Sequence, residues 1–263
     1  MSCPQYQQKR SVTLDSGSTT GRHVLATLLQ QADVVLHQHT PDMADASPLQ
    51  TEALRHAYPR LVVAGITPFG QFGPYSGNSG TELTSCALSG LSEGLGENDR
   101  SPLVAPFGQA GYQAGLSAAS ATVLALLVRE MSGQGQAIDI AEADVLATLQ
   151  TGVYLNNFHF DGTKSMRGHR FGSRTIYPAS FYRCRDGFMW VTAPQWAQWE
   201  RLLEMIGRAE LAEDERFHNR RRIADNPPPE LDVHQCREAR LPIAPVYHID
   251  ELIAHPNLST VVF

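Results

Sequence analysis

Apolar and polar positions recur with two different periods along the first part of the chain. Val24, Leu25, Leu28 and Leu29 lie in the i, i+1, i+4, i+5 pattern of an amphipathic helix, which predicts a helix over Gly21–Gln31. Apolar residues alternate with polar ones over Lys9–Asp15, as in a half-buried strand. Short apolar runs at 32–36 and 61–66 are typical of buried strands. Strand, helix and strand in this order predict a parallel α/β unit.

The central part of the chain contains its longest apolar segment. Ala118–Met131 is rich in Ala and Leu and carries charge only at its end, which predicts a helix buried between other elements. We expect Gly108–Gly111 to be a flexible segment before this helix, and Ser132–Gly135 to end it, since glycine suits a helix C-cap. A short strand over Ala137–Ile140 and a second helix from Ala141 should follow.

Further elements are predicted on both sides of this central part. Helices are expected to end near Ala57 and to begin near Thr81, with Thr81 or Ser79 as the N-cap. Phe181–Thr192 has two alternating runs about Asp-Gly, a dipeptide that favours hairpin turns. Trp196–Ile206 is predicted to be an amphipathic helix that ends at a glycine.

Composition and charge exclude several classes of protein. The 263 residues are 42% hydrophobic and 18% charged, which is ordinary for a soluble globular protein. The net charge of −6 disfavours a nucleic-acid partner, because such proteins usually carry a basic surplus. No stretch of the sequence approaches the roughly 20 apolar residues of a membrane span, and residues 1–12 lack the apolar core of a signal peptide. We therefore expect a cytoplasmic protein with no membrane partner.

The metal-binding residue types show no spacing that predicts a metal site. Cys3, Cys86, Cys184 and Cys236 are scattered and form no Cys-x-x-Cys pair, so reduced structural thiols are expected. His37 and His39 lie two residues apart, without an evident third ligand.

Three runs of sequence resemble the class III CoA-transferases, the CaiB/BaiF family. They are YQAGLSAASATVLALLVREMSGQGQAIDIAEADVLATL from Tyr112, the run YPRLVVAGITPFGQFGP from Tyr58, and QKRSVTLD around Lys9. The resemblance implies an α/β fold, with a Rossmann-like parallel sheet and helices plus a smaller α+β domain, and with the N-terminal unit of the family missing. It implies a partial CoA-binding domain over residues 1–155, a linker over 156–180 and a partial small domain over 181–263. The chain is thus similar to a shortened member or a degenerate half.

The resemblance also implies where coenzyme A or an acyl-CoA would bind. Lys9 and Arg10 match basic residues of the family that approach the CoA phosphates or the edge of the adenine, and basic side chains suit phosphate. Taken without the family, the sequence favours a solvated strand entry for the same two residues over a phosphate contact. Gln38 and His39 fall in the loop where the family contacts CoA, although they depart from its Asn-aromatic-x-Pro pattern.

The family's catalytic position is altered in this chain. Family members carry an aspartate nucleophile in a pattern close to Asp-aromatic-x-x-Gly, and it forms first a mixed anhydride and then an aspartyl-CoA thioester. Here the aromatic residue is Tyr112 and the glycine is Gly115, so the nucleophile's position is Gly111. Glycine has no side chain and cannot attack a thioester. Glu82 is the one carboxylate expected nearby, and it is a weak candidate for a substitute.

Two hypotheses about function remain open at this point. One is a catalytically impaired relative that binds CoA, as a homodimer or as a heteromer with a full-length relative. The other is an active CoA-transferase that exchanges CoA between an acyl-CoA and a carboxylic acid, using another carboxylate or a partner chain. A racemase of the same family fails, because Thr81 and Gly111 replace both proton-transfer groups of that pattern.

Overall fold

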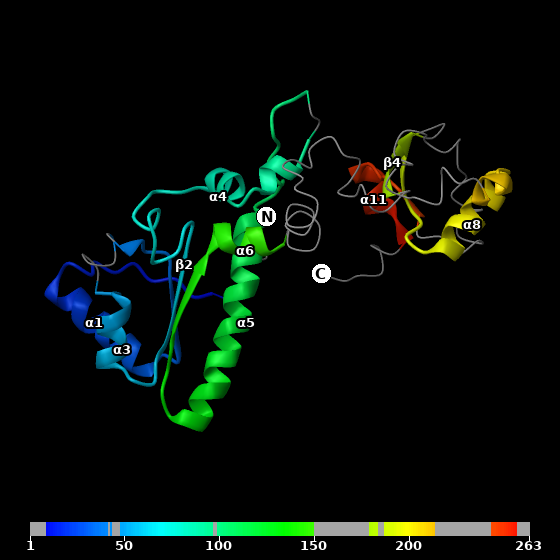
Figure 1. The fold of residues 1–263 in the computed structure, drawn as a ribbon. Helices are drawn as coiled ribbons and strands as arrows, with labels where there is room; N and C mark the ends of the chain where they lie inside the picture. The colour runs from blue at the N-terminus through cyan, green and yellow to red at the C-terminus, as the bar shows by residue number, and fades with distance from the viewer. Residues whose placement is uncertain are drawn as a thin grey trace. The chain divides into compact units, whose positions relative to one another are not determined.

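The computed structural model describes residues 9–41, 43, 48–96, 99–149, 179–183, 187–213 and 243–256, and the chain divides into two compact units (Figure 1). The first unit comprises Met1–Leu95 with Pro102–Gly152, and the second Gly96–Ser101 with Val153–Phe263. The predicted linker over 156–180 lies almost wholly outside the described residues. The predicted domain boundaries stay predictions.

A parallel sheet of three strands forms the centre of the first unit. Its order is β1 (Val34–His37), β2 (Val62–Thr67) and β3 (Ala137–Ala141), and both pairings are parallel. β2 is the central strand and all but one of its residues are buried, as its apolar sequence predicts. The predicted α/β fold with a parallel sheet is therefore confirmed.

Helices cover both faces of this sheet (Figure 1). α1 (Thr19–Gln31) and α3 (Thr51–Ala57) pack on one face, where Leu29, Leu54 and Val63 belong to one buried cluster. α5 (Gln109–Ser132) runs along β2 and β3. At its N-terminal end it meets α4 (Glu82–Leu88) and α6 (Glu142–Thr148), and a short helical turn, η2 (Leu91–Gly94), follows α4.

The α5 helix differs in two ways from the sequence-based prediction. It begins at Gln109, so Gly111 lies in its first turn and Gly108–Gly111 is not a flexible segment. The prediction of a helix buried on all sides is also wrong. The buried residues of α5 are four alanines and one arginine, namely Ala110, Ala114, Ala118, Ala125 and Arg129. Most of its large apolar side chains are exposed. The predicted end is confirmed, because Gly133 adopts a left-handed conformation with φ of 75° directly after the last helical residue.

Two of the predicted strands also differ. Residues 9–15 form no strand, and most of their side chains are exposed, because none of the described strands pairs with this segment. The strand predicted over 32–36 exists as β1, but it is only half-buried. Among the described strands β1 pairs with β2 alone, so it lies at an edge of the sheet, where Leu36 is exposed.

The second unit is built on an antiparallel sheet. β4 (Ala179–Arg183) and β5 (Phe188–Thr192) form the predicted hairpin, and β6 (Ile243–Pro245) pairs with β5. α8 (Trp196–Met205) ends before Gly207, as predicted, and contributes Trp199, Leu202 and Leu203 to the core of this unit. A short helical turn, η5 (Ala209–Ala212), and a helix, α11 (Ile249–Ala254), complete its described elements.

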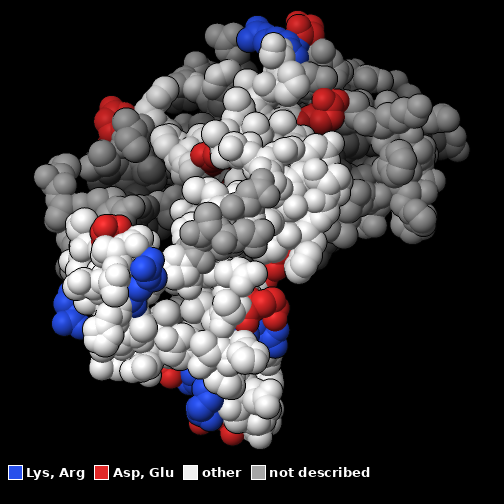
Figure 2. Space-filling model, turned by 90° about the vertical axis from the view of Figure 1, so that its left-hand side faces the viewer, with Lys and Arg blue, Asp and Glu red and all other residues white. Residues whose placement is uncertain are grey.

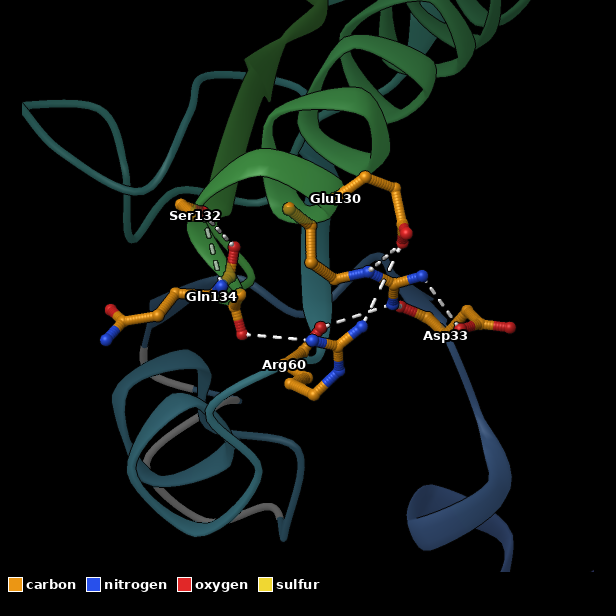
Figure 3. A network of polar contacts seen from close by, with 7 residues as sticks. Asp33, Arg60, Glu130, Ser132 and Gln134 are labelled. Carbon is orange, nitrogen blue, oxygen red and sulfur yellow. Dashed lines mark hydrogen bonds and ion pairs between the residues drawn. The ribbon is translucent and has the colours of Figure 1, made fainter.

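The C-terminal end of α5 is held by a network of polar contacts (Figure 3). The guanidinium of Arg129 donates to the carboxylate of Asp33 at 2.9 Å and to the backbone carbonyl of Arg60 at 3.3 Å. Arg60 in turn donates to the carbonyl of Gly133 at 3.3 Å. These contacts tie the starts of β1 and β2 to the end of α5 and fix the helix along the sheet.

Candidate functional site

Polar side chains gather where the three parallel strands end. His37 is the last residue of β1, Thr67 is the last residue of β2, and Asp139 lies within β3. Gln71 links these strands, because its backbone N–H donates to Asp139 at 2.9 Å and its side-chain amide donates to the carbonyl of His39 at 2.9 Å. Ligands of parallel α/β sheets bind beyond this edge. The edge is therefore the first candidate for a binding site.

The His37 imidazole is buried, and both of its ring nitrogens have polar neighbours. Only 5% of the residue is exposed; its Nδ1 accepts a hydrogen bond from the backbone N–H of His39, and its Nε2 lies 3.3 Å from the hydroxyl of Thr51. Burial lowers the pKa of His37, and the nearby His39 lowers it further, whereas the Asp139 carboxylate acts in the opposite direction. The hydrogen bond that Nδ1 of His37 accepts from the His39 backbone helps to orient the loop after β1.

Glycine allows this edge to pack closely. A Cβ at Gly65 would lie 3.0 Å from Cε1 of His37, which is tighter than ordinary contacts allow. Gly70 has a φ of 81°, a conformation that other residues rarely adopt. Two buried polar atoms at this edge, Nδ1 of His39 and Oγ1 of Thr67, have no hydrogen-bond partner among the described residues. Buried polar atoms without a partner are uncommon in proteins, which marks this edge as a place to look for function.

The four predicted CoA-binding residues occupy two different places. Gln38 and His39 directly follow β1 at the carboxyl edge of the sheet, with Gln38 exposed and His39 half-buried. Lys9 and Arg10 lie exposed in the irregular segment before α1. On the face that Figure 2 displays, the described Lys and Arg residues lie apart from one another, with Asp and Glu among them, and do not form one basic patch.

The N-terminal end of α5 is the second candidate site. Gly111 is exposed in the first turn of the helix, and a Cβ built on it would meet no atom within 4 Å. Its backbone is that of a regular helix, so neither packing nor conformation requires glycine here. The side chain of Glu82 reaches this turn, because its Oε1 accepts a hydrogen bond from the backbone N–H of Ala110 at 3.2 Å. The predicted proximity of Glu82 to Gly111 is thus seen directly.

The contacts of α4 hold Glu82 in this position. Thr81 caps the helix together with Thr84, as the sequence predicts. One turn further on, the buried hydroxyl of Ser85 donates to the Glu142 carboxylate of α6 at 2.9 Å. Burial, and after it the Glu82 carboxylate, raise the pKa of the neighbouring Cys86 thiol, which disfavours its thiolate form.

Sequence reasoning missed four of these residues, namely Gln71, Ser85, Asp139 and Glu142. Asp139 was placed correctly in a short strand, and a polar residue within a strand that ends at the carboxyl edge of a parallel sheet is a usable signal. The partners of the other three are 32 to 68 residues away in the sequence, and no local pattern indicates such contacts. Within the described residues, no group of three or more His, Cys, Asp or Glu side chains is placed to hold a metal ion.

Comparison with known proteins decides the family. The sequence pattern of CoA-transferase family III matches residues 5–261. The chain belongs to this family. It is similar to the probable fatty acyl-CoA transferase Rv3272 of Mycobacterium tuberculosis, with 30% identity over 83% of the chain and 57% of that protein. It is also similar to the succinate–glutarate CoA-transferase of Agrobacterium fabrum, with 29% identity over 95% of the chain and 66% of that protein.

Solved structures of the family have the same fold. A CaiB/BaiF family protein from Brucella suis superimposes with a TM-score of 0.75 and 25% identity, over 95% of the chain and 70% of that protein. Rv3272 superimposes with a TM-score of 0.81 and 24% identity, over 96% of the chain and 70% of Rv3272. This family III chain spans between 57% and 66% of the length of the two curated relatives described above.

Proposed function

We propose that this family III chain binds coenzyme A or an acyl-CoA and is impaired in CoA transfer. The observation that carries the proposal is Gly111, an exposed glycine in the first turn of α5 with open space where a side chain would lie. The family resemblance assigns the nucleophilic aspartate to this position. Loss of a covalent nucleophile typically costs several orders of magnitude in rate.

Glu82 is an inadequate replacement for that aspartate. Its side chain accepts the N–H of Ala110 in the first turn of α5, and this hydrogen bond holds the side chain where it is. A carboxylate held by such a hydrogen bond must give it up, or share its lone pairs, before it attacks a thioester. Glu82 therefore serves first to fix the start of α5.

The coenzyme would bind at the carboxyl edge of the sheet. Gln38 and His39 lie there. Two buried atoms of this region, Nδ1 of His39 and Oγ1 of Thr67, have no hydrogen-bond partner among the described residues. Lys9 and Arg10 would contact the phosphates, whose charge basic side chains match. An acyl-CoA is the ligand expected for the family, and the cytoplasm is the compartment where we place the protein.

The second candidate is an active transferase that exchanges CoA between an acyl-CoA and a carboxylic acid. The closeness of the Glu82 carboxylate to Gly111 favours it, because this is the one carboxylate bonded to that helical turn among the described residues. Attack by Glu82, or by a carboxylate of a partner chain, would replace the missing aspartate.

Acyl-CoA turnover and trapping separate the two candidates. The purified chain is incubated with succinyl-CoA and hydroxylamine, and a glutamyl hydroxamate on Glu82 is sought by mass spectrometry. We expect no adduct and no CoA exchange with added dicarboxylic acids. Gly111→Asp should gain exchange, whereas the uncharged isostere Gly111→Asn should not. An adduct on the unmodified chain that Glu82→Gln abolishes would establish the active enzyme instead.

A further inference from the structure

A concave pocket, here called the α4 pocket, lies between the loop after β2 and the helix α4. Its volume is about 560 Å³, which is within the range of small-molecule sites. The rings of Phe69 and Tyr75 come from the loop, with their centroids 6.1 Å apart. Ala87 and Leu88 come from the helix. The lining of the α4 pocket is therefore mostly apolar.

The loop is folded into this shape by close backbone packing. A Cβ at Gly80 would lie 2.4 Å from Cβ of Pro68 and 3.0 Å from Cε2 of Phe69, so glycine lets the chain return beside this ring. Between these two points the backbone N–H of Asn78 donates to the carbonyl of Tyr75 at 2.9 Å and closes a turn. The α4 pocket is thus part of the folded unit before any ligand binds.

The polar residues of the lining are uncharged, namely Asn78, Ser79 and Thr84. The Thr84 hydroxyl is already used, because it accepts the N–H of Thr81 and donates to the carbonyl of Thr81, both at 2.8 Å. Residues 61–99, to which every lining residue belongs, contain four carboxylate side chains and no Lys, Arg or His. A negatively charged ligand group would lose its hydration in this pocket and find no cation in the lining.

The same loop links the α4 pocket to the carboxyl edge of the sheet. Gln71 follows Phe69 by two residues, and its side-chain amide donates to the carbonyl of His39 at 2.9 Å. His39 belongs to the residues proposed for coenzyme binding. At the other end of the loop, α4 begins with Glu82, whose side chain bonds the first turn of α5. One loop thus lines the pocket and contacts the proposed coenzyme site.

We propose that the α4 pocket takes the acyl group of an acyl-CoA and selects apolar monocarboxylic acyl groups over dicarboxylic ones. This inference rests on the proposed function, since it names the acyl group that would accompany the coenzyme. Apolar walls gain free energy from each methylene group that they remove from water. The free carboxylate of a succinyl group would gain nothing comparable, because the lining has no cation to pair with it.

Binding of thioesters to the purified chain tests the proposal. The probes are octanoyl-CoA, succinyl-CoA and CoA, together with octanoyl- and succinyl-N-acetylcysteamine, which lack the nucleotide. Isothermal titration calorimetry measures each dissociation constant. We expect octanoyl-CoA to bind at least about tenfold more tightly than CoA, and succinyl-CoA to bind no more tightly than CoA. The octanoyl ester of N-acetylcysteamine should likewise bind more tightly than its succinyl ester.

Leu88→Lys should change this preference. Leu88 is 48% exposed, so the fold tolerates the new side chain, and its ammonium would pair with the succinyl carboxylate. We expect the affinity for octanoyl-CoA to fall about tenfold and the affinity for succinyl-CoA to rise. Leu28→Lys is the matched control, at a leucine of α1 that is 49% exposed and does not line the pocket, and it should leave both affinities unchanged. If Leu88→Lys does not fold, Tyr75→Ala should lower the affinity for octanoyl-CoA and not that for CoA.

Equal affinities of the octanoyl and succinyl thioesters for the parent would overturn the proposal. So would a preference that Leu88→Lys or Tyr75→Ala leaves unchanged, or that Leu28→Lys reduces equally. The esters without the nucleotide separate this failure from that of the proposed function. If CoA does not bind but octanoyl-N-acetylcysteamine does, the coenzyme site is contradicted and the pocket is supported. If CoA binds and an octanoyl group adds no affinity, the pocket is contradicted and the proposed function stands.

Discussion

The carboxylate of Glu82, in the first turn of α4, accepts the backbone N–H of Ala110, in the first turn of α5. The first turn of a helix has N–H groups without intrahelical partners, and its dipole favours a negative charge. Glu82 satisfies one of these groups from another helix and thereby joins the two helix starts. The residue next to Ala110 is Gly111, so Glu82 holds in place the helical turn that contains the glycine on which the proposed function rests.

Replacing Gly111 should stabilise the protein. A glycine within a helix costs about 0.5–1 kcal/mol relative to alanine, and the Cβ of Gly111→Ala would meet open space. We expect an increase of about 0.5–1 kcal/mol in the free energy of unfolding, measured by urea denaturation with an unchanged m-value. The matched control is Gly80→Ala, whose Cβ would lie 2.4 Å from Pro68 and should destabilise. A loss of stability in Gly111→Ala would show that the site is more crowded than described.

Stability should depend on pH through His37. Burial lowers the pKa of His37 in the folded protein, so the unfolded chain binds a proton at this side chain more tightly than the folded chain does. This contribution is fully present above the unfolded value of about 6.5 and is lost as the pH falls below it. The urea midpoint should therefore decrease from pH 7.5 to pH 5.5.

The assignment to His37 is checked with two variants. His37→Gln should show a smaller decrease of the urea midpoint over the same pH range, because the titrating group is gone. His23→Gln, an exposed change on α1, should retain the decrease of the parent. Equal pH dependence in the parent and in His37→Gln would contradict the assignment. Because His37 orients the backbone of His39, CoA binding should weaken if His39 contacts the ligand, but only below the lowered pKa of His37 in the folded protein, at a pH under 6.5.

Arg129 should matter more for stability than the exposed ion pairs. Its side chain is only 10% exposed and also bonds backbone carbonyls of Asp33 and Arg60, whereas the Asp33 side chain is 75% exposed. Removing the arginine takes a donor from the Arg60 carbonyl and from the Asp33 carboxylate, whereas the Asp33 carbonyl keeps the Val62 N–H and water still reaches Asp33. We therefore expect Arg129→Met to cost about 1–3 kcal/mol. Arg55→Met removes an exposed pair with Glu52 and should cost less than about 0.5 kcal/mol. Equal costs measured by urea denaturation would refute the anchoring role of Arg129.

The sequence by itself determined the elements with strong local patterns. The amphipathic helix α1, the apolar strand β2, the Thr81 cap and the glycine after α5 all follow from side-chain periodicity and backbone preference, which act over a few residues. The same local patterns, together with the family resemblance, led to the proposal that Gly111 is the altered position, and this stays a prediction. These features depend on neighbours within about one turn or one strand, and the printed sequence contains those neighbours.

Only the tertiary structure decided which surfaces are covered and which distant groups meet. Lys9–Asp15 has a strand pattern but no strand to pair with among the described ones, and α5 is apolar all round although only one of its faces is packed. Likewise, Glu82 meets Ala110 from 28 residues away, and Gln71 meets Asp139 from 68. Strand pairing and burial depend on residues that are distant in the sequence but close in the fold, and the periodicity of a segment does not identify those residues.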